Sequence, residues 1–181
     1  MKKLKITLFL ILSFSGFLSL QIIWNQFYLN AKSIEPEKQK YSSYENALQT
    51  LNITTTQKQV LTFKTIKEPI IVLNFWASWC VPCLKEFPSL VEFQEKYKGR
   101  VKVIGINGDE ESPIENIKKI EAKYKLNFSS VSDPESKISD QFLITSYPVS
   151  IVFLKGKVIY LSQKNHNFMS EDFRKLIDES L

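Results

Sequence analysis

Hydrophobic residues in this chain gather in short continuous runs, separated by stretches with helical spacing. Ile70 to Trp76 is a nearly continuous run of β-branched and aromatic residues, which predicts a buried strand. Apolar residues then recur at every third or fourth position and predict a helix over about 82–98. Val101 to Ile106 predicts a second core strand. A helix between two buried strands is typical of an α/β domain.

The rest of the chain continues this alternation of strands and helices. Val60 to Ile66 alternates and predicts an opening strand, and Tyr44 to Leu51 has the pattern of a short helix. The later elements are a helix with a capping box at Ser112 and Glu115, a short helix from Asp133, strands over 149–154 and 157–162, and a final helix capped by Ser170. Together these elements predict a mixed central β-sheet flanked by helices.

The first 24 residues have a different pattern. Three lysines within the first five residues precede a mostly apolar stretch from Ile6 to Trp24. At about 1.5 Å per residue, roughly 19 helical residues nearly span the hydrocarbon core of a bilayer. The lysines predict a cytoplasmic N-terminus and an exported C-terminal domain. A cleavable signal peptide is the alternative, but residues 21–25 lack the small residues of a cleavage site.

These patterns divide the chain into a signal anchor or transmembrane helix over 1–24, a polar tether over 25–56 and a domain over 57–181. The formal net charge is +5, but residues 1–30 hold three lysines and no acidic residue. The remainder has 21 basic and 19 acidic residues, with no basic stripe interleaved with aromatic side chains. We therefore expect no nucleic-acid partner.

The two cysteines of the chain, Cys80 and Cys83, lie where the predicted strand gives way to the predicted helix. At a helix N-terminus, free N–H groups and the helix dipole favour a thiolate. Cys83 lies about one turn further along the helix, close enough for a disulfide to form. This arrangement predicts a reversible dithiol switch.

Other uses of this cysteine pair fit the chain less well. A tetrahedral zinc site needs four ligands, yet His166 is the only histidine, and it lies in a polar stretch that we expect at the surface. A c-type haem site needs a histidine where Leu84 stands. A structural disulfide with a two-residue spacer closes a very small loop and stabilises little. We therefore expect neither a metal nor a cofactor.

The segment from Leu73 to Cys83 reads Leu-Asn-Phe-Trp-Ala-Ser-Trp-Cys-Val-Pro-Cys and resembles the thioredoxin superfamily. More narrowly, it is similar to the membrane-anchored TlpA/ResA-type thiol–disulfide oxidoreductases of bacteria. Three further matches are Pro88 in the active-site helix, Tyr147-Pro148 at the cis-proline loop, and Gly156 to Val158 at the last hairpin turn. The resemblance covers about residues 57–181 and implies a thioredoxin-like α/β fold.

The resemblance also implies roles for the residues around the dithiol. Cys80 attacks a substrate disulfide, Cys83 resolves the mixed disulfide, and Glu86 matches a glutamate with an acid–base role in ResA-like proteins. The alternative for Glu86 is a solvated glutamate near the start of a helix. Asn74 replaces the buried aspartate of thioredoxin, so we expect a hydrogen-bonded buried amide there. The expected apolar collar for the substrate consists of Trp79, Pro82, Tyr147 and Pro148.

The function that this resemblance implies is reduction of disulfides in exported proteins, for example apocytochrome c before haem attachment. Electrons would come from a membrane thiol reductase of the CcdA/DsbD type. The protein would be a single-pass protein of a bacterial cell membrane, with its domain on the periplasmic or extracytoplasmic side. Two alternatives stay open, a disulfide-forming oxidant and a copper-binding assembly factor, although copper factors of this fold typically have three residues between the cysteines.

Overall fold

The structure is a computed structural model that describes residues 16–26 and 41–181. Residues 16–26 form a helix. By its contacts the chain divides into two units, Met1–Ser42 and Ser43–Leu181. Among the described residues, no helix combines the length and the apolar character needed to cross a bilayer. The predicted anchor over 1–24 and the predicted tether over 25–56 fall partly outside the described residues.

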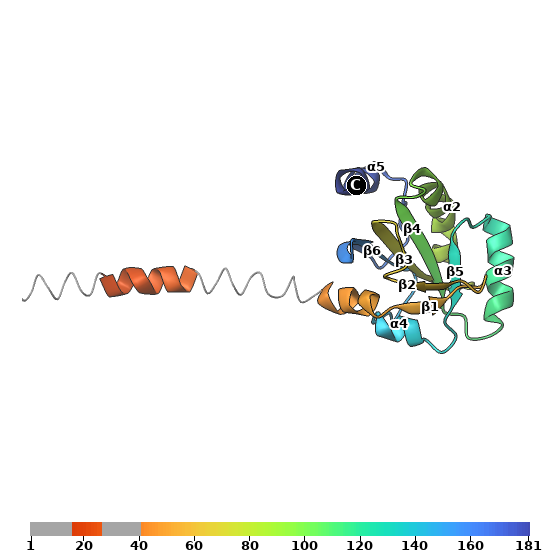
Figure 1. Cartoon of the computed structure of the whole chain (residues 1–181), viewed down its shortest axis with the longest axis horizontal. Helices are drawn as coiled ribbons and strands as arrows, with labels where there is room; N and C mark the ends of the chain where they lie inside the picture. Colours follow the sequence, from red (N-terminus) through yellow and green to blue (C-terminus); the bar gives the residue numbers. More distant parts are fainter. Residues whose placement is uncertain (1–15, 27–40) are drawn as a thin grey trace, which may run out of the picture. The chain divides into compact units, whose positions relative to one another are not determined.

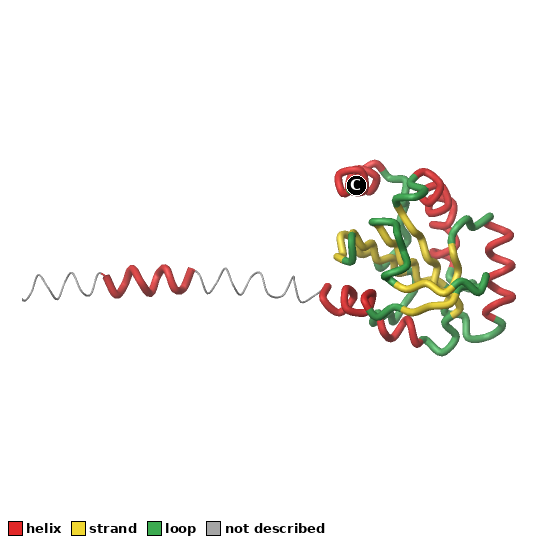
Figure 2. The backbone as a smooth tube through the Cα atoms, viewed as in Figure 1, coloured by secondary structure: helices red, strands yellow, loops and turns green. Residues whose placement is uncertain are grey.

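A five-stranded mixed sheet forms the centre of the second unit (Figure 1, Figure 2). In spatial order its strands are β5 (Ser129–Ser132), β4 (Val101–Asn107), β3 (Ile70–Trp76), β6 (Val149–Leu154) and β7 (Lys157–Ser162). β3, β4 and β5 run parallel, whereas β6 is antiparallel to both β3 and β7. The mixed central sheet is confirmed, but β5 was not predicted, because its Ser-Ser-Val-Ser sequence is short and polar.

Helices and a small hairpin cover the two faces of this sheet (Figure 1). The core on one face includes side chains of α2 (Val81–Lys96), α3 (Pro113–Tyr124) and α5 (Glu171–Ser180). The core on the other face includes side chains of a helix over 41–49, the antiparallel pair β1 (Asn52–Thr54) and β2 (Val60–Thr62), and α4 (Lys137–Gln141). The flanking helices are therefore present as predicted, although α4 begins at Lys137 and not at Asp133.

The alternation of side chains along β3 decides which of them reach α2. Val72 and Trp76 lie in the same core cluster as the buried side chains of α2. Leu73 and Phe75 lie in the cluster on the opposite face. Asn74, midway between Val72 and Trp76, therefore lies on the face that α2 covers.

Residues 43–56, predicted as part of the tether, belong to the compact unit that begins at Ser43. Glu45 pairs with Lys157 of β7 at 2.7 Å, which joins this segment to the edge of the sheet. The buried side chains of the segment include Leu48, Leu51 and Ile53. The predicted short helix is present over 41–49, and its apolar side chains explain why the segment packs on the domain.

Three local predictions are wrong in detail. Ser112 precedes α3 with a left-handed backbone, φ 47°, and makes no side-chain capping bond, since capping serines normally have an extended backbone. Ser170 occupies the N-cap position of α5, but its hydroxyl makes no capping bond. The predicted strand over 60–66 ends at Thr62, because the Thr62 N–H donates to Thr65 Oγ1 at 2.9 Å and the chain turns.

Candidate active site

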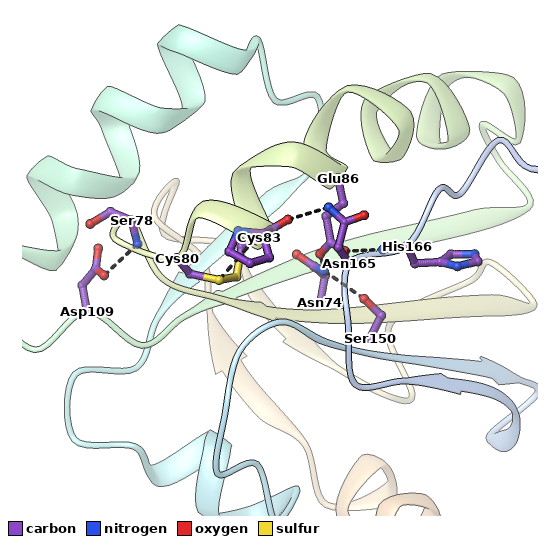
Figure 3. Close-up of a disulfide and its surroundings, with 10 residues drawn as sticks. Asn74, Ser78, Cys80, Cys83, Glu86, Asp109, Ser150, Asn165 and His166 are labelled. Atoms are coloured by element: carbon purple, nitrogen blue, oxygen red, sulfur yellow. Dashed lines mark hydrogen bonds between the residues drawn. A yellow bond between two sulfur atoms is a disulfide. The ribbon is translucent and has the colours of Figure 1, made fainter.

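Cys80 and Cys83 form a disulfide at the N-terminus of α2 (Figure 3). Cys80 is the N-cap residue of this helix, and its Sγ accepts a hydrogen bond from the Cys83 N–H at 3.2 Å. Cys80 is 4% exposed and Cys83 is 0% exposed, so Cys80 lies nearer to solvent. The free N–H groups at this helix end favour negative charge on sulfur. The predicted position of the pair at a helix start is confirmed.

The loop between β3 and α2 is fixed by a buried carboxylate from the end of β4. The Ser78 N–H donates to Asp109 Oδ1 at 2.9 Å (Figure 3). Asn107 in turn holds Asp109, because its Nδ2 donates to Asp109 Oδ2 at 3.1 Å and its Oδ1 accepts from the Asp109 N–H at 3.2 Å. Asp109 was not predicted as a site residue, since no local pattern around it reveals this contact.

Glu86 lies one helical turn after Cys83 and is 2% exposed. Its Oε1 accepts a hydrogen bond from Asn74 Nδ2 at 2.6 Å, and its Oε2 accepts one from the His166 backbone N–H at 3.2 Å (Figure 3). Burial raises the pKa of Glu86 to about 7, although both hydrogen bonds lower it. The solvated-glutamate alternative is therefore wrong. The expected buried, hydrogen-bonded amide at Asn74 is confirmed.

The segment between β7 and α5 is hydrogen-bonded along the first turns of α2. Asn165 Nδ2 donates to the Pro82 carbonyl at 2.9 Å (Figure 3). The Phe168 N–H donates to Ser89 Oγ at 3.2 Å. With the His166 contact to the Glu86 carboxylate, these bonds fix the backbone of this segment beside the helix that carries the cysteines.

His166 is half-buried, so the prediction that it lies at the surface holds only in part. Its Nδ1 is 3.1 Å from the Tyr160 hydroxyl, and its ring packs edge-on against Phe168 and Phe173 at 5.1 Å and 4.8 Å between centroids. Burial and the charge of Lys164 lower the pKa of His166 below its usual value. The aromatic neighbours explain why a histidine in a polar stretch is drawn inward. In the described part of the chain, His, Cys, Asp and Glu side chains form no cluster of three that could hold a metal.

The four predicted collar residues differ in their exposure. Trp79 is 69% exposed, and its ring meets the half-buried Tyr147 ring edge-on at 6.0 Å between centroids. Pro82 is exposed, whereas Pro148 is buried and follows a cis peptide bond. Of the four predicted collar residues, Trp79, Pro82 and part of Tyr147 are therefore exposed near the disulfide, whereas Pro148 is buried; Val81, between the two cysteines, is also exposed, at 59%.

Tyr147 approaches Gly108 so closely that a side chain at position 108 would clash with it, which gives a testable prediction. A Cβ at position 108 would overlap the Tyr147 hydroxyl and lie too close to its ring. We expect Gly108→Ala to displace Tyr147 from Trp79 and to lower the free energy of unfolding by roughly 1–3 kcal/mol, measured by urea denaturation. The control is the same substitution in a Tyr147→Ala background, where the overlap is gone. An equal loss of stability in both backgrounds would rule out this explanation.

Comparison with known sequences gives a family match over most of the second unit. The sequence profile described as "AhpC/TSA family" matches residues 45–161. A relative named thiol-disulfide oxidoreductase ResA, from Bacillus cereus, is 34% identical over 110 residues, which cover 59% of this chain and 62% of the relative. The chain thus matches less than two thirds of the length of that relative.

Solved structures show the same fold. A secreted disulfide oxidoreductase from Mycobacterium tuberculosis, homologous to E. coli DsbE, is similar with a TM-score of 0.62 and 21% identity, covering 74% of this chain and 98% of that chain. StoA from Bacillus subtilis is similar with a TM-score of 0.59 and 22% identity, covering 70% of this chain and 95% of that chain. The predicted thioredoxin-like α/β fold is therefore confirmed.

Proposed function

This chain belongs to the AhpC/TSA family, and we propose that it is a thiol–disulfide oxidoreductase that reduces protein disulfides through Cys80 and Cys83. The observation that carries the proposal is the disulfide at the start of α2, one turn from a buried carboxyl group with a pKa of about 7. Disulfide exchange needs a thiolate and a group that takes up a proton near neutral pH, and these residues supply both. The ResA relative carries this activity in its name.

The exchange proceeds in two steps that each break and form one sulfur–sulfur bond. In the reduced protein, the Cys80 thiolate attacks one sulfur of the substrate disulfide and expels the other as a thiolate. The Cys83 thiol then loses its proton and attacks Cys80 Sγ in the mixed disulfide. The Cys80–Cys83 disulfide forms, and the substrate leaves as a dithiol, its disulfide having gained two electrons in total.

We assign Glu86 as the acceptor of the Cys83 proton. Cys83 is 0% exposed, so its proton needs an acceptor inside the protein when the thiol becomes a nucleophile. The ionised Glu86 carboxylate lies one turn away on the same helix and binds that proton with an affinity suited to neutral pH. The exposed Trp79 and Pro82, with Tyr147 beside them, supply the surface against which the substrate segment lies.

The direction of electron flow, the partners and the location are further parts of this proposal. They rest on the resemblance to membrane-anchored reductants and on the lysine-led apolar stretch over 1–24. The protein would be anchored in a bacterial membrane with its domain outside the cytoplasm. It would receive electrons from a membrane thiol reductase of the CcdA/DsbD type and reduce exported proteins such as apocytochrome c.

The test of this function is the reduction potential of the Cys80–Cys83 pair, measured in the purified full-length protein by equilibration in defined thiol buffers. For a reductant we expect a value near that of thioredoxin, about −270 mV, or lower. A value near that of a strong oxidant, about −120 mV, would reverse the direction and make the protein a disulfide donor.

A further inference from the structure

Ser150 lies directly opposite Asn74 in the register of β3 and β6. Both residues are buried in the sheet. Asn74 Nδ2 donates to Ser150 Oγ at 2.9 Å and to Glu86 Oε1 at 2.6 Å (Figure 3). The Asn74 amide therefore connects a serine of the neighbouring strand to the carboxylate on α2.

These two hydrogen bonds use both hydrogens of the Asn74 amide nitrogen. The other end of the amide, Oδ1, is buried and has no hydrogen-bond partner among the residues that the structure describes. If the side-chain amide were rotated by 180°, its two N–H groups would occupy the present position of Oδ1, where they would have no acceptor. Buried unpaired N–H groups are tolerated less well than an underused carbonyl oxygen. The contacts therefore fix the amide with its nitrogen toward Glu86.

We propose that Ser150 is a positioning residue, which accepts one amide hydrogen and so holds Asn74 as a hydrogen-bond donor to the Glu86 carboxylate. The inference rests on the proposed function, in which Glu86 takes up the Cys83 proton. A fixed donor stabilises the ionised carboxylate over the neutral acid, which opposes the effect of burial. Ser150 thereby keeps Glu86 able to ionise near neutral pH.

No other side chain described around Glu86 donates a hydrogen bond to its carboxylate. On α2, Cys83 lies one turn earlier and is held in the disulfide. From the segment between β7 and α5, His166 offers its backbone N–H to Oε2, while its imidazole is directed to Tyr160. The influences on the pKa of Glu86 are accordingly burial, the Asn74 amide and this backbone N–H, without a charged neighbour.

The test is the pKa of Glu86 in the oxidised full-length protein, obtained from its carboxyl band in infrared difference spectra against Glu86→Gln. In Ser150→Ala we expect this pKa to rise by about one pH unit, a tenfold change in proton affinity or about 1.4 kcal/mol. The rise follows because the amide loses one of the two acceptors that fix its orientation. Ser150→Thr keeps the hydroxyl and is expected to titrate like the wild type.

Ser130→Ala is the matched control, because Ser130 is also buried in the sheet but its Oγ has no partner among the described residues. The role of Ser150 is overturned if Ser150→Ala leaves the pKa of Glu86 unchanged, if Ser130→Ala raises it equally, or if Ser150→Thr titrates like Ser150→Ala. This titration needs no substrate. The proposed function is tested separately, by whether the reduced wild-type protein reduces insulin disulfides.

Discussion

Cys83→Ala protein is expected to accumulate as mixed disulfides with its substrates, and its disulfide reductase activity is expected to fall to the background of the buffer. Cys80 is the N-cap of α2 and the more exposed sulfur, so its thiolate still attacks a substrate disulfide. Without Cys83 no thiol remains in the chain to resolve the adduct. The adducts are measured by mass spectrometry and on non-reducing gels after incubation of the reduced variant with insulin.

Cys80→Ala is the matched control for this experiment. It leaves one thiol at the same site, but Cys83 is 0% exposed and lies inside the helix rather than at its cap. We expect this variant to lose activity as well, without accumulating adducts. Equal trapping by both variants would show that the two cysteines exchange roles, and the assignment of Cys80 as the attacking sulfur would be wrong.

The sequence predicts the dithiol and its position because the signals for them are local. The apolar run of β3, the cysteine pair and the helical spacing of α2 follow one another within Ile70–Lys96. Each element is recognised from its own residues, and the order of strand, loop and helix places the cysteines at a helix N-terminus. A weakly apolar strand such as β5 gives no comparable signal, and it was missed.

The surroundings of the dithiol depend on contacts between distant parts of the chain. The Asn74–Ser150 hydrogen bond joins residues 76 positions apart, and the His166 N–H reaches Glu86 over 80 positions. Neither a capping rule nor a periodic pattern carries such information. The resemblance to ResA-like proteins identifies Glu86 as a candidate. Its burial, however, depends on the packing of β3, α2 and the segment before α5. The same packing explains why His166 lies inward.

The wild-type protein is expected to lose stability as the pH rises from about 4.5 to about 7, and Glu86→Gln is expected to abolish this pH dependence. Burial raises the pKa of Glu86 from 4.5 to about 7, so the folded state holds its proton more tightly than the unfolded chain. The stability from this proton is complete below about pH 4.5 and is lost by about pH 7. Its size is about 3 kcal/mol, at about 1.4 kcal/mol per pH unit. Glutamine has no proton to lose, so the variant should not show this loss.

The comparison is made by urea denaturation of the oxidised protein at about pH 5 and about pH 8. Glu92→Gln is the control, because Glu92 is an exposed glutamate on the same helix and its variant should follow the wild type at both pH values. If Glu86→Gln also follows the wild type, the pKa of Glu86 is not raised by folding and the carboxyl group is unsuited to the Cys83 proton. A second readout is the pH dependence of alkylation of the two cysteines in the reduced protein. If Glu86→Gln changes the pH dependence of stability but leaves the pH dependence of cysteine alkylation unchanged, Glu86 is a buried structural group and takes no part in the proton transfer.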